Sequence, residues 1–391
     1  MPPSLLGIAM SKSLPAYLEP SSGRTYPIDA PRWRSDDGKP LMITDLPGIS
    51  RDEIVSSARS IWRYAAALPV NVSDPITMGE GLTPLVERRW HGGRALFKLE
   101  WFAPTGSFKD RGASVMMSIL RQQGIRHVLE DSSGNGGAAV AAYAAAGGLK
   151  AKILAPGYTQ PGKTVQMRVY GAEVELTPGT RQDCADAAEA QSAQIFYASH
   201  NWQAFFLQGT KTLAYELWED LGFRAPDNIL IPTGAGSNVL GCDIGFSELL
   251  RAGQIAKLPR LFAVQPANCA PIQAGFASGA TDFAPVETRP TIAEGTSIAK
   301  PIRTREVLAA LRRSQGGAVA VSEDEIVAAL VELAGTGLYA EPTCATAAAA
   351  LTKLLAQGVI KPEETTVVLL TGTGLKATQK VGELLGVLPP A

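Results

Sequence analysis

The stretch P-T-G-S-F-K-D-R-G at residues 104–112 stands between two predicted elements. Residues 94–101 before it alternate well enough for a strand, and residues 113–121 after it read as a helix. Lys109 is therefore predicted in the first turn of a helix. The helix dipole disfavours an ammonium group there unless the lysine pairs with a carboxylate or loses its proton.

A lysine that loses its proton in this way is a chemical tool. The neutral amine is the nucleophile that forms Schiff bases with carbonyl compounds. The alternative interpretation of Lys109 is an ordinary surface lysine paired with Asp110. A short motif alone does not decide between the two, so the rest of the chain has to.

Length and composition limit the kind of protein. The chain has 391 residues, beyond the roughly 250–300 at which a single core stops growing, so at least two lobes are expected. Lys and Arg number 36 against 37 Asp and Glu, a formal charge of -1. Such a balance provides no basic field for nucleic acid or anionic lipid, and neither is expected as a partner.

The four cysteines are far apart and form no C-x-x-C pair, which argues against a zinc site and a disulfide framework. The first residues lack the pattern of a signal peptide, and no apolar run has membrane-spanning length. The sequence therefore predicts a soluble, cytoplasmic protein that does not associate with a membrane.

From about residue 94 onward, short apolar runs alternate with alanine-rich helical stretches. This order predicts an α/β fold of two lobes, with parallel-rich sheets covered by helices on both faces. Residues 1–75 are Pro-rich and are interpreted as an N-terminal extension with one helix at residues 51–67. Residues 76–391 are expected to form the main body.

Three glycine-bearing loops follow predicted strands, at residues 132–137, 232–238 and 370–376. Ligands bind at the carboxyl ends of strands in open α/β sheets, so the three loops predict one shared crevice. The first could hold a carboxylate at a helix start, or could be an ordinary helix cap. The second could receive a phosphate, although its spacing is neither that of a P-loop nor that of a dinucleotide site. The third offers a threonine hydroxyl to a ring nitrogen, or is a simple turn.

One ligand accounts for the three loops together with Lys109. It carries an aldehyde, a phosphate and a nitrogen-containing ring, and its substrate carries a carboxylate. Pyridoxal phosphate, with an amino acid as substrate, has all of these groups.

The combined motifs resemble the fold-type II pyridoxal-phosphate enzymes, which have the same two-lobed fold as the β subunit of tryptophan synthase. Among them the chain is most similar to the threonine synthase family. The resemblance extends from about residue 60 to the C-terminus. Beyond the segments already quoted, it is carried by W-R-Y at residues 62–64, G-E-G-L-T-P-L at 79–85, G-T-K-T-L-A at 209–214 and E-P-T-C-A-T-A at 341–347.

The resemblance implies a role for each loop. Lys109 would be the Schiff-base lysine, Phe108 would lie beside the cofactor and Thr371 would face the pyridine nitrogen. The phosphate would be held by Gly234, Ala235, Gly236, Ser237 and Asn238.

The loop at residues 132–137 would serve the substrate. Asn135 would also hydrogen-bond the ring hydroxyl of the cofactor. The substrate carboxylate would be held by Ser132, Ser133, Gly134 and Asn135. A small lobe at about residues 113–200 would close over the substrate, and a homodimer is a candidate assembly.

The N-terminal extension resembles a zinc ribbon that some relatives carry. Where that pattern has cysteines, this chain has Glu19, Ser22, Ser35 and Asp37. A structural zinc site needs its thiolates, so no metal is expected.

Two positions depart from the family pattern for a phosphorylated substrate. The residue after S-G-N is commonly Thr and is Gly136 here, and an expected Arg is Phe206. Loss of that Arg would remove a charge-assisted bond of about 1.5–3 kcal/mol. The residues that could compensate are His200, Asn201, Lys300 and Arg303. Alternatively, Lys300 and Arg303 lie on a solvated surface and His200 is a packed residue.

The leading functional hypothesis is a pyridoxal-phosphate lyase of the threonine synthase type, which removes a leaving group from an amino acid and adds water. A threonine or serine ammonia-lyase, or a β-replacement enzyme, is the alternative on the same scaffold. A pyridoxal-phosphate carrier without turnover is a third hypothesis, and a substrate-carboxylate loop argues against it.

Overall fold

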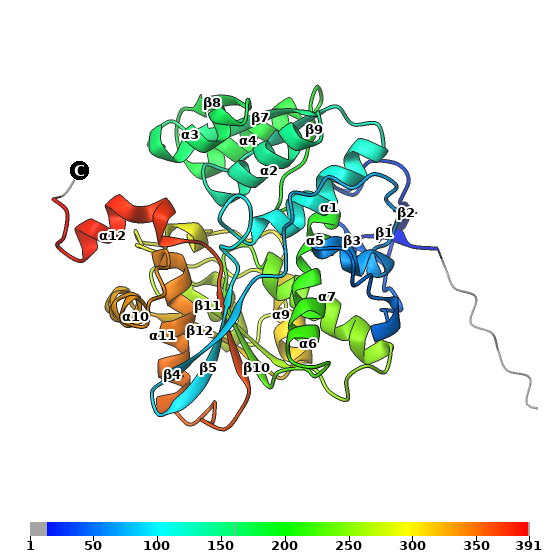
Figure 1. The fold of residues 1–391 in the computed structure, drawn as a ribbon. Helices are drawn as coiled ribbons and strands as arrows, with labels where there is room; N and C mark the ends of the chain where they lie inside the picture. Colours follow the sequence, from blue (N-terminus) through cyan, green and yellow to red (C-terminus); the bar gives the residue numbers. More distant parts are fainter. Residues whose placement is uncertain (1–13, 160, 390–391) are drawn as a thin grey trace, which may run out of the picture.

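The computed structural model describes residues 14–159 and 161–389, and a six-stranded sheet lies at its centre (Figure 1). The strand order is β12-β11-β10-β13-β5-β4. Neighbouring strands pair in parallel from β12 to β5, and β4 pairs antiparallel with β5. The strands are β4 (Leu85–Trp90), β5 (Gly93–Leu99), β10 (Asn228–Pro232), β11 (Arg260–Pro266), β12 (Gly317–Val321) and β13 (Thr366–Leu370).

Both faces of this sheet are covered by helices, because its central strands are apolar on both sides. On β10, Leu230 packs into one hydrophobic cluster while Ile229 and Ile231 pack into another. The first cluster includes α10 (Glu323–Gly335) and α11 (Pro342–Ala356). The second includes α6 (Thr212–Asp220), α7 (Ser237–Arg251) and α9 (Thr304–Arg313). The predicted α/β class, with helices on both faces of a parallel-rich sheet, is confirmed (Figure 1).

A second, four-stranded parallel sheet lies above the first in Figure 1, in the order β8-β7-β6-β9. Its strands are β6 (His127–Glu130), β7 (Lys150–Pro156), β8 (Glu173–Thr177) and β9 (Phe196–Tyr197). The helices around it are α2 (Asn135–Ala146), α3 (Pro161–Val169) and α4 (Arg181–Gln191).

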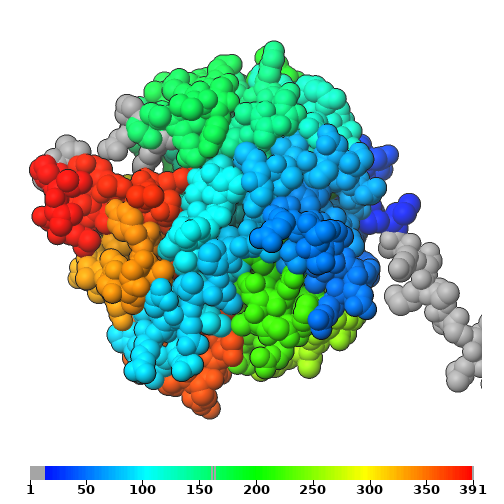
Figure 2. All heavy atoms as spheres, viewed as in Figure 1, coloured from blue at the N-terminus to red at the C-terminus, as the bar shows by residue number. Residues whose placement is uncertain are grey.

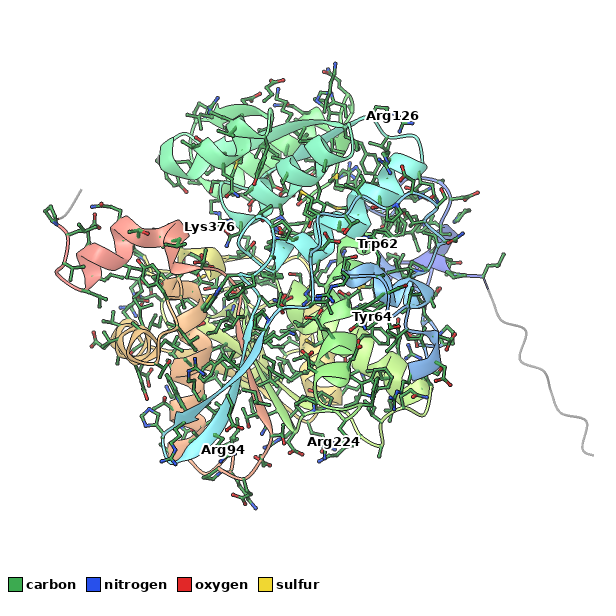
Figure 3. The ribbon with its side chains drawn as sticks, in the orientation of Figure 1. Trp62, Tyr64, Arg94, Arg126, Arg224 and Lys376 are labelled. Carbon is green, nitrogen blue, oxygen red and sulfur yellow. The ribbon has the colours of Figure 1, made fainter. Side chains whose placement is uncertain are left out.

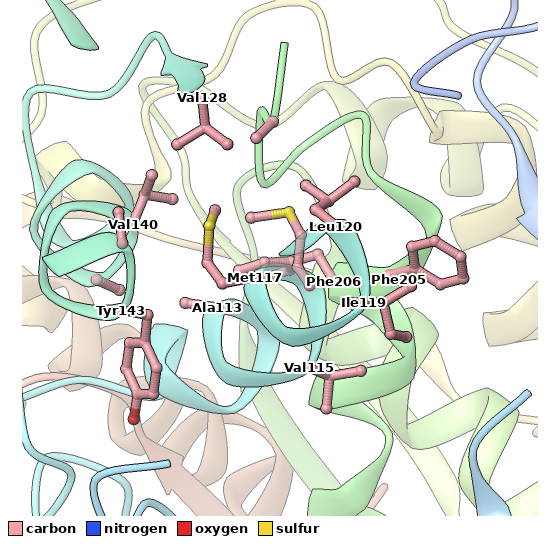
Figure 4. Packing of buried hydrophobic residues seen from close by; sticks show 14 of the residues in the cluster. Ala113, Val115, Met117, Ile119, Leu120, Val128, Val140, Tyr143, Phe205 and Phe206 are labelled. Atoms are coloured by element: carbon pink, nitrogen blue, oxygen red, sulfur yellow. The ribbon is translucent and has the colours of Figure 1, made fainter. Parts of the chain in front are cut away.

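Helix α1 (Lys109–Gln122) connects the two sheets, and most of its residues are buried. It packs against α2 and against α5 (Ala204–Thr210). Figure 4 shows Met117 of α1 among Val140, Tyr143 and Phe206 from these neighbours. The residue that begins α1 is therefore held by an element with almost no freedom to move.

The N-terminal segment forms a small antiparallel sheet of β1 (Ala16–Leu18), β2 (Thr25–Pro27) and β3 (Met42–Ile43). It is the blue part of Figure 2, on one side of the molecule. Two tight turns project from it, and Arg24 and Asp37 join them by an ion pair. The Glu19 carboxylate accepts hydrogen bonds from the hydroxyls of Ser21 and Ser22. Within the described ranges, no group of three or more His, Cys, Asp or Glu side chains could hold a metal ion.

The predicted helix at residues 51–67 is wrong. The chain forms two 3₁₀ segments instead, Arg51–Glu53 and Ile61–Ala67, separated by a turn. Ser60 caps the second segment, and the Trp62 indole donates to Ser114 Oγ at 2.9 Å. Serines that bond local backbone and an indole anchored on α1 outweigh the weak helix propensity of this stretch.

Several short elements were not predicted from the sequence. They are β4, β12, α5, α8 (Pro271–Ala277) and α12 (Thr378–Leu384). The four cysteines are free and buried. Among the helices of the described residues, none is long and apolar enough to cross a membrane.

Candidate active site

Lys109 lies where the carboxyl ends of two neighbouring strands meet. It is the first residue of α1, as predicted, and the loop before it follows β5. The Phe108 backbone N–H donates to Thr371 O at 3.1 Å, and Ser107 forms an isolated bridge with Gly372. Because β5 and β13 pair in parallel, the lysine loop and the C-terminal glycine loop emerge side by side.

The amine of Lys109 has no carboxylate partner within the described ranges. The bland interpretation paired it with Asp110, but that side chain accepts from the Thr105 backbone at 2.7 Å and from the Thr105 hydroxyl. Lys109 Nζ instead lies 4.7 Å from the centroid of the Phe108 ring and 5.6 Å from that of Phe206. The pairing with Asp110 is therefore wrong.

The surroundings of Lys109 favour its neutral form. Burial lowers the pKa of the Lys109 amine from 10.5 to about 8, and the charge of Arg181 lowers it further, against the opposing carboxylates of Glu130 and Glu341. The side chain keeps partial contact with solvent. A desolvated, partly accessible amine of lowered pKa is suited to nucleophilic chemistry.

The second glycine loop follows β10, the strand next to β13, and leads into α7. Gly236 has a φ of 92°, a left-handed conformation that glycine adopts at little cost. Asn238, one residue into the helix, is buried, and neither its Oδ1 nor its Nδ2 has a protein partner in the described part of the chain. An orphaned amide at a helix N-terminus fits a bound phosphate, to which the amide and the backbone N–H groups could donate.

The first glycine loop reaches the same place from the smaller sheet. It follows β6 and leads into α2, whose first residue is Asn135. Asn135 Nδ2 donates to Glu341 Oε1 at 3.3 Å, and Asn135 Oδ1 accepts from Lys376 Nζ at 2.9 Å. Figure 3 places Lys376 on the C-terminal segment facing the smaller sheet. These contacts bring the first and third loops together.

The remaining candidates lie in this crevice or beside it. Thr371 is buried at the end of β13, with its hydroxyl 3.4 Å from Cys344 Sγ. Ser132 is buried, Ser133 is half-buried and Gly134 is exposed at the entrance to α2. The predicted convergence of loops thus includes the lysine segment and the residues Ser132, Ser133, Gly134, Asn135, Gly234, Ala235, Gly236, Ser237, Asn238 and Thr371.

Sequence reasoning missed three charged residues near Lys109. Glu341 and Lys376 belong to quoted motifs but were given no role. Glu130 ends β6, fully buried, and it was treated only as part of a strand. A carboxylate at the carboxyl end of a parallel strand was the available signal.

The residues proposed to replace the missing arginine are differently placed. Arg303 is buried, not solvated, and donates to the carbonyls of Asn201 and Trp202 at 3.1 and 2.6 Å. Burial lowers its pKa to about 10. Lys300 is exposed, as the alternative interpretation held. Neither cation is placed to meet a ligand beside Lys109.

A desolvated lysine at the start of a helix, a glycine loop with an orphaned amide and a sheet edge where four loops meet define a class of protein. The chain belongs to the pyridoxal-phosphate dependent enzymes, whose family matches residues 76–372. It is a lyase of this family with the fold-type II architecture, and it uses pyridoxal phosphate.

Within that family the chain is similar to threonine synthases. It is 34% identical to that of Methanocaldococcus jannaschii over 368 residues, covering 90% of this chain and 91% of the relative. It is 34% identical to that of Mycobacterium tuberculosis over 325 residues, covering 81% and 88%. Among solved structures, a bacterial-type match described as a threonine deaminase superposes with a TM-score of 0.63 at 27% identity, covering 74% of this chain and 92% of the other.

Proposed function

We propose that the protein removes a leaving group from an amino acid and adds water, as a threonine synthase does. The substrate class includes O-phosphohomoserine, which would give threonine and phosphate, and related amino acids. The 34% identity to threonine synthases over most of both chains supports this reaction. The observation that carries the proposal is the unpaired amine of Lys109, with its lowered pKa, beside a glycine loop fit for phosphate.

The cofactor, when bound, withdraws electrons from the substrate carbons at which protons and leaving group depart. Lys109 would bond the cofactor aldehyde and, once released, would move protons to and from the substrate. Phe108 would lie beside the ring, and Thr371 would offer its hydroxyl to the ring nitrogen. The phosphate would be held by Gly234, Ala235, Gly236, Ser237 and Asn238.

The substrate carboxylate would be bound at the start of α2. Backbone N–H groups and hydroxyls there could donate to it, with Ser132, Ser133, Gly134 and Asn135 as the contacts. Asn135 would exchange its bonds with Glu341 and Lys376 for the ring hydroxyl of the cofactor. We also propose that residues 113–200 close over the substrate as a small lobe and that residues 1–75 form a separate extension.

One observation favours the alternative, an ammonia-lyase or β-replacement enzyme. Phe206, fully buried, lies beside Lys109 where the family pattern has an arginine. An aromatic ring cannot donate to a phosphate dianion, so a substrate with a smaller or neutral leaving group suits this wall better.

Two experiments test the function. The purified holoenzyme is assayed with O-phosphohomoserine, threonine, serine and O-acetylserine. Threonine plus phosphate from the first supports the proposal, and a 2-oxo acid plus ammonia from threonine or serine supports the alternative. In the second, Lys109→Ala should lose the visible absorption of the bound cofactor and at least about 10³-fold in turnover. The exposed Lys300→Ala serves as control, and an unchanged spectrum in Lys109→Ala would refute the assignment.

A further inference from the structure

The two departures from the family pattern meet in one wall of the site. The Phe206 ring packs against Gly112, where a Cβ would lie 2.5 Å from the ring carbons. The His200 ring packs against Gly136, where a Cβ would lie 2.7 Å from Cε1 and Nδ1. The two rings contact each other edge to face, with centroids 5.6 Å apart. Each glycine thus makes room for one ring, and the four residues form a single complementary set.

His200 is held in this wall by a buried carboxylate. Its Nδ1 lies 3.0 Å from Glu130 Oε1, and its backbone N–H donates to Glu130 Oε2 at 3.0 Å. Glu130 is fully buried and also accepts from the Asp131 backbone at 3.1 Å. With two backbone donors favouring its ionised form, the carboxylate fixes the imidazole with its proton on Nδ1.

The charges around His200 keep the ring neutral. Burial lowers its pKa well below 6.5, and Lys109 and Arg181 lower it further, while Asp131 opposes them. Burial likewise raises the pKa of Glu130 to about 7. Within the described ranges Nε2 has no hydrogen-bond partner, so its lone pair is free to accept a proton.

We propose that His200, oriented by Glu130, is the general base that takes a proton from the water that adds to the substrate. This inference rests on the proposed function and assigns the side of the site opposite the lysine loop. Phe206 links the two sides, since Lys109 Nζ lies 5.6 Å from the ring that His200 also contacts.

The proton and electron count of this step closes. The water oxygen bonds the substrate carbon that has lost its leaving group, and one O–H bond breaks with its proton passing to His200 Nε2. The electron pair displaced from the carbon–carbon double bond takes up a proton at the neighbouring carbon from Lys109. Glu130 stabilises the imidazolium and acts as a positioning residue, and His200 then returns its proton to solvent.

The kinetic test compares His200→Gln with wild type on whichever substrate of the panel turns over. We expect kcat to fall at least about 100-fold and KM to change less than about threefold. Binding of the amino acid should still change the visible spectrum of the variant holoenzyme. His127→Gln, on the same strand as Glu130 but at its far end, should keep wild-type kcat.

Glu130→Gln guards against misfolding of the histidine variant. Its amide would donate to Nδ1 and force the proton to Nε2, leaving packing intact but removing the base. We expect the rise of kcat with pH through about 7 to disappear in this variant. Nitrogen-15 NMR of the holoenzyme should show an Nδ1–H tautomer for His200 at pH 8 and an Nε2–H tautomer in Glu130→Gln. The chain has 3 histidines, so His91 and His127 are internal references.

The inference fails if His200→Gln keeps kcat within threefold of wild type, or if wild-type His200 carries its proton on Nε2 at pH 8. Failure of the proposed function looks different, because wild type itself would then release neither threonine nor any other hydration product from the panel.

Discussion

Two cations two residues apart in α1 are treated in opposite ways. Arg111 is fully buried, and its guanidinium donates to Glu100 Oε2 at 2.7 Å and to Glu216 Oε1 at 2.8 Å. Burial alone would lower the pKa of Arg111, but the two carboxylates raise it well above its usual value. Lys109 has no such partner within the described ranges, and its pKa falls to about 8. Residues two apart on a helix face different sides, so one turn supports both environments.

The difference separates a structural charge from a chemical one. The Arg111 cluster joins the end of β5, α1 and α6, and it includes Lys98, whose Nζ lies 2.7 Å from Glu216. Arg111 and Lys98 overcome the effect of burial and hold the pKa of Glu216 well below its usual range. A matched cluster of this kind fixes geometry, while an unmatched amine beside it remains free to react.

The largest effect should come from breaking the matched cluster. Arg111→Met leaves Glu100 buried without its cation and Glu216 with Lys98 alone. We expect the free energy of unfolding to fall by about 3–5 kcal/mol, the usual cost of an uncompensated buried charge. Urea unfolding of the cofactor-free protein measures it. A change below about 1 kcal/mol would mean that the cluster does not hold α1 in place.

The unmatched cation should respond in the opposite direction. Lys109→Met removes a charge that is poorly solvated in the folded protein, at the loss of its contacts with Phe108 and Phe206. Allowing for the partial solvent contact of this side chain, we expect the cofactor-free protein to gain about 1 kcal/mol of stability at pH 7.

The pH dependence of that gain has a definite sign. Between pH 8 and 10.5 the unfolded lysine holds a proton that the folded one has lost. The gain is therefore complete below about pH 8 and disappears toward pH 10.5. Urea unfolding of both proteins across this range checks it, and a variant less stable than wild type at pH 7 would contradict it.

The reactivity of Lys109 sharpens the comparison without changing stability. The rate at which the cofactor-free protein captures an aldehyde should rise with pH and level off above about 8, because the neutral amine is then fully formed. Glu130→Gln removes a carboxylate that raises the pKa of Lys109, so its curve should shift to lower pH. A rate that keeps rising to pH 10.5 would show an ordinary lysine.

Sequence reasoning found the parts of this site that depend on neighbouring residues. Lys109, Thr371 and Ser237 lie at strand-to-helix junctions, and local periodicity places such junctions well. It could not place contacts between distant segments. Glu130 and His200 are 70 positions apart, and only packing of β6 against β9 brings them together. Arg303 was expected at the surface because an arginine without a carboxylate is seldom buried, yet two carbonyls satisfy it.

The smallest effect is expected where a charge pair is exposed. Arg94 Nη1 lies 3.2 Å from Glu87 Oε1, with side chains 75% and 51% exposed, at the end of the β4–β5 hairpin (Figure 3). Water screens such a pair, and ordering two long side chains offsets the attraction. Arg94→Ala should change the free energy of unfolding by less than about 0.5 kcal/mol in the urea experiment used for Arg111→Met. If both variants lost the same stability, burial would not be what distinguishes a structural charge in this fold.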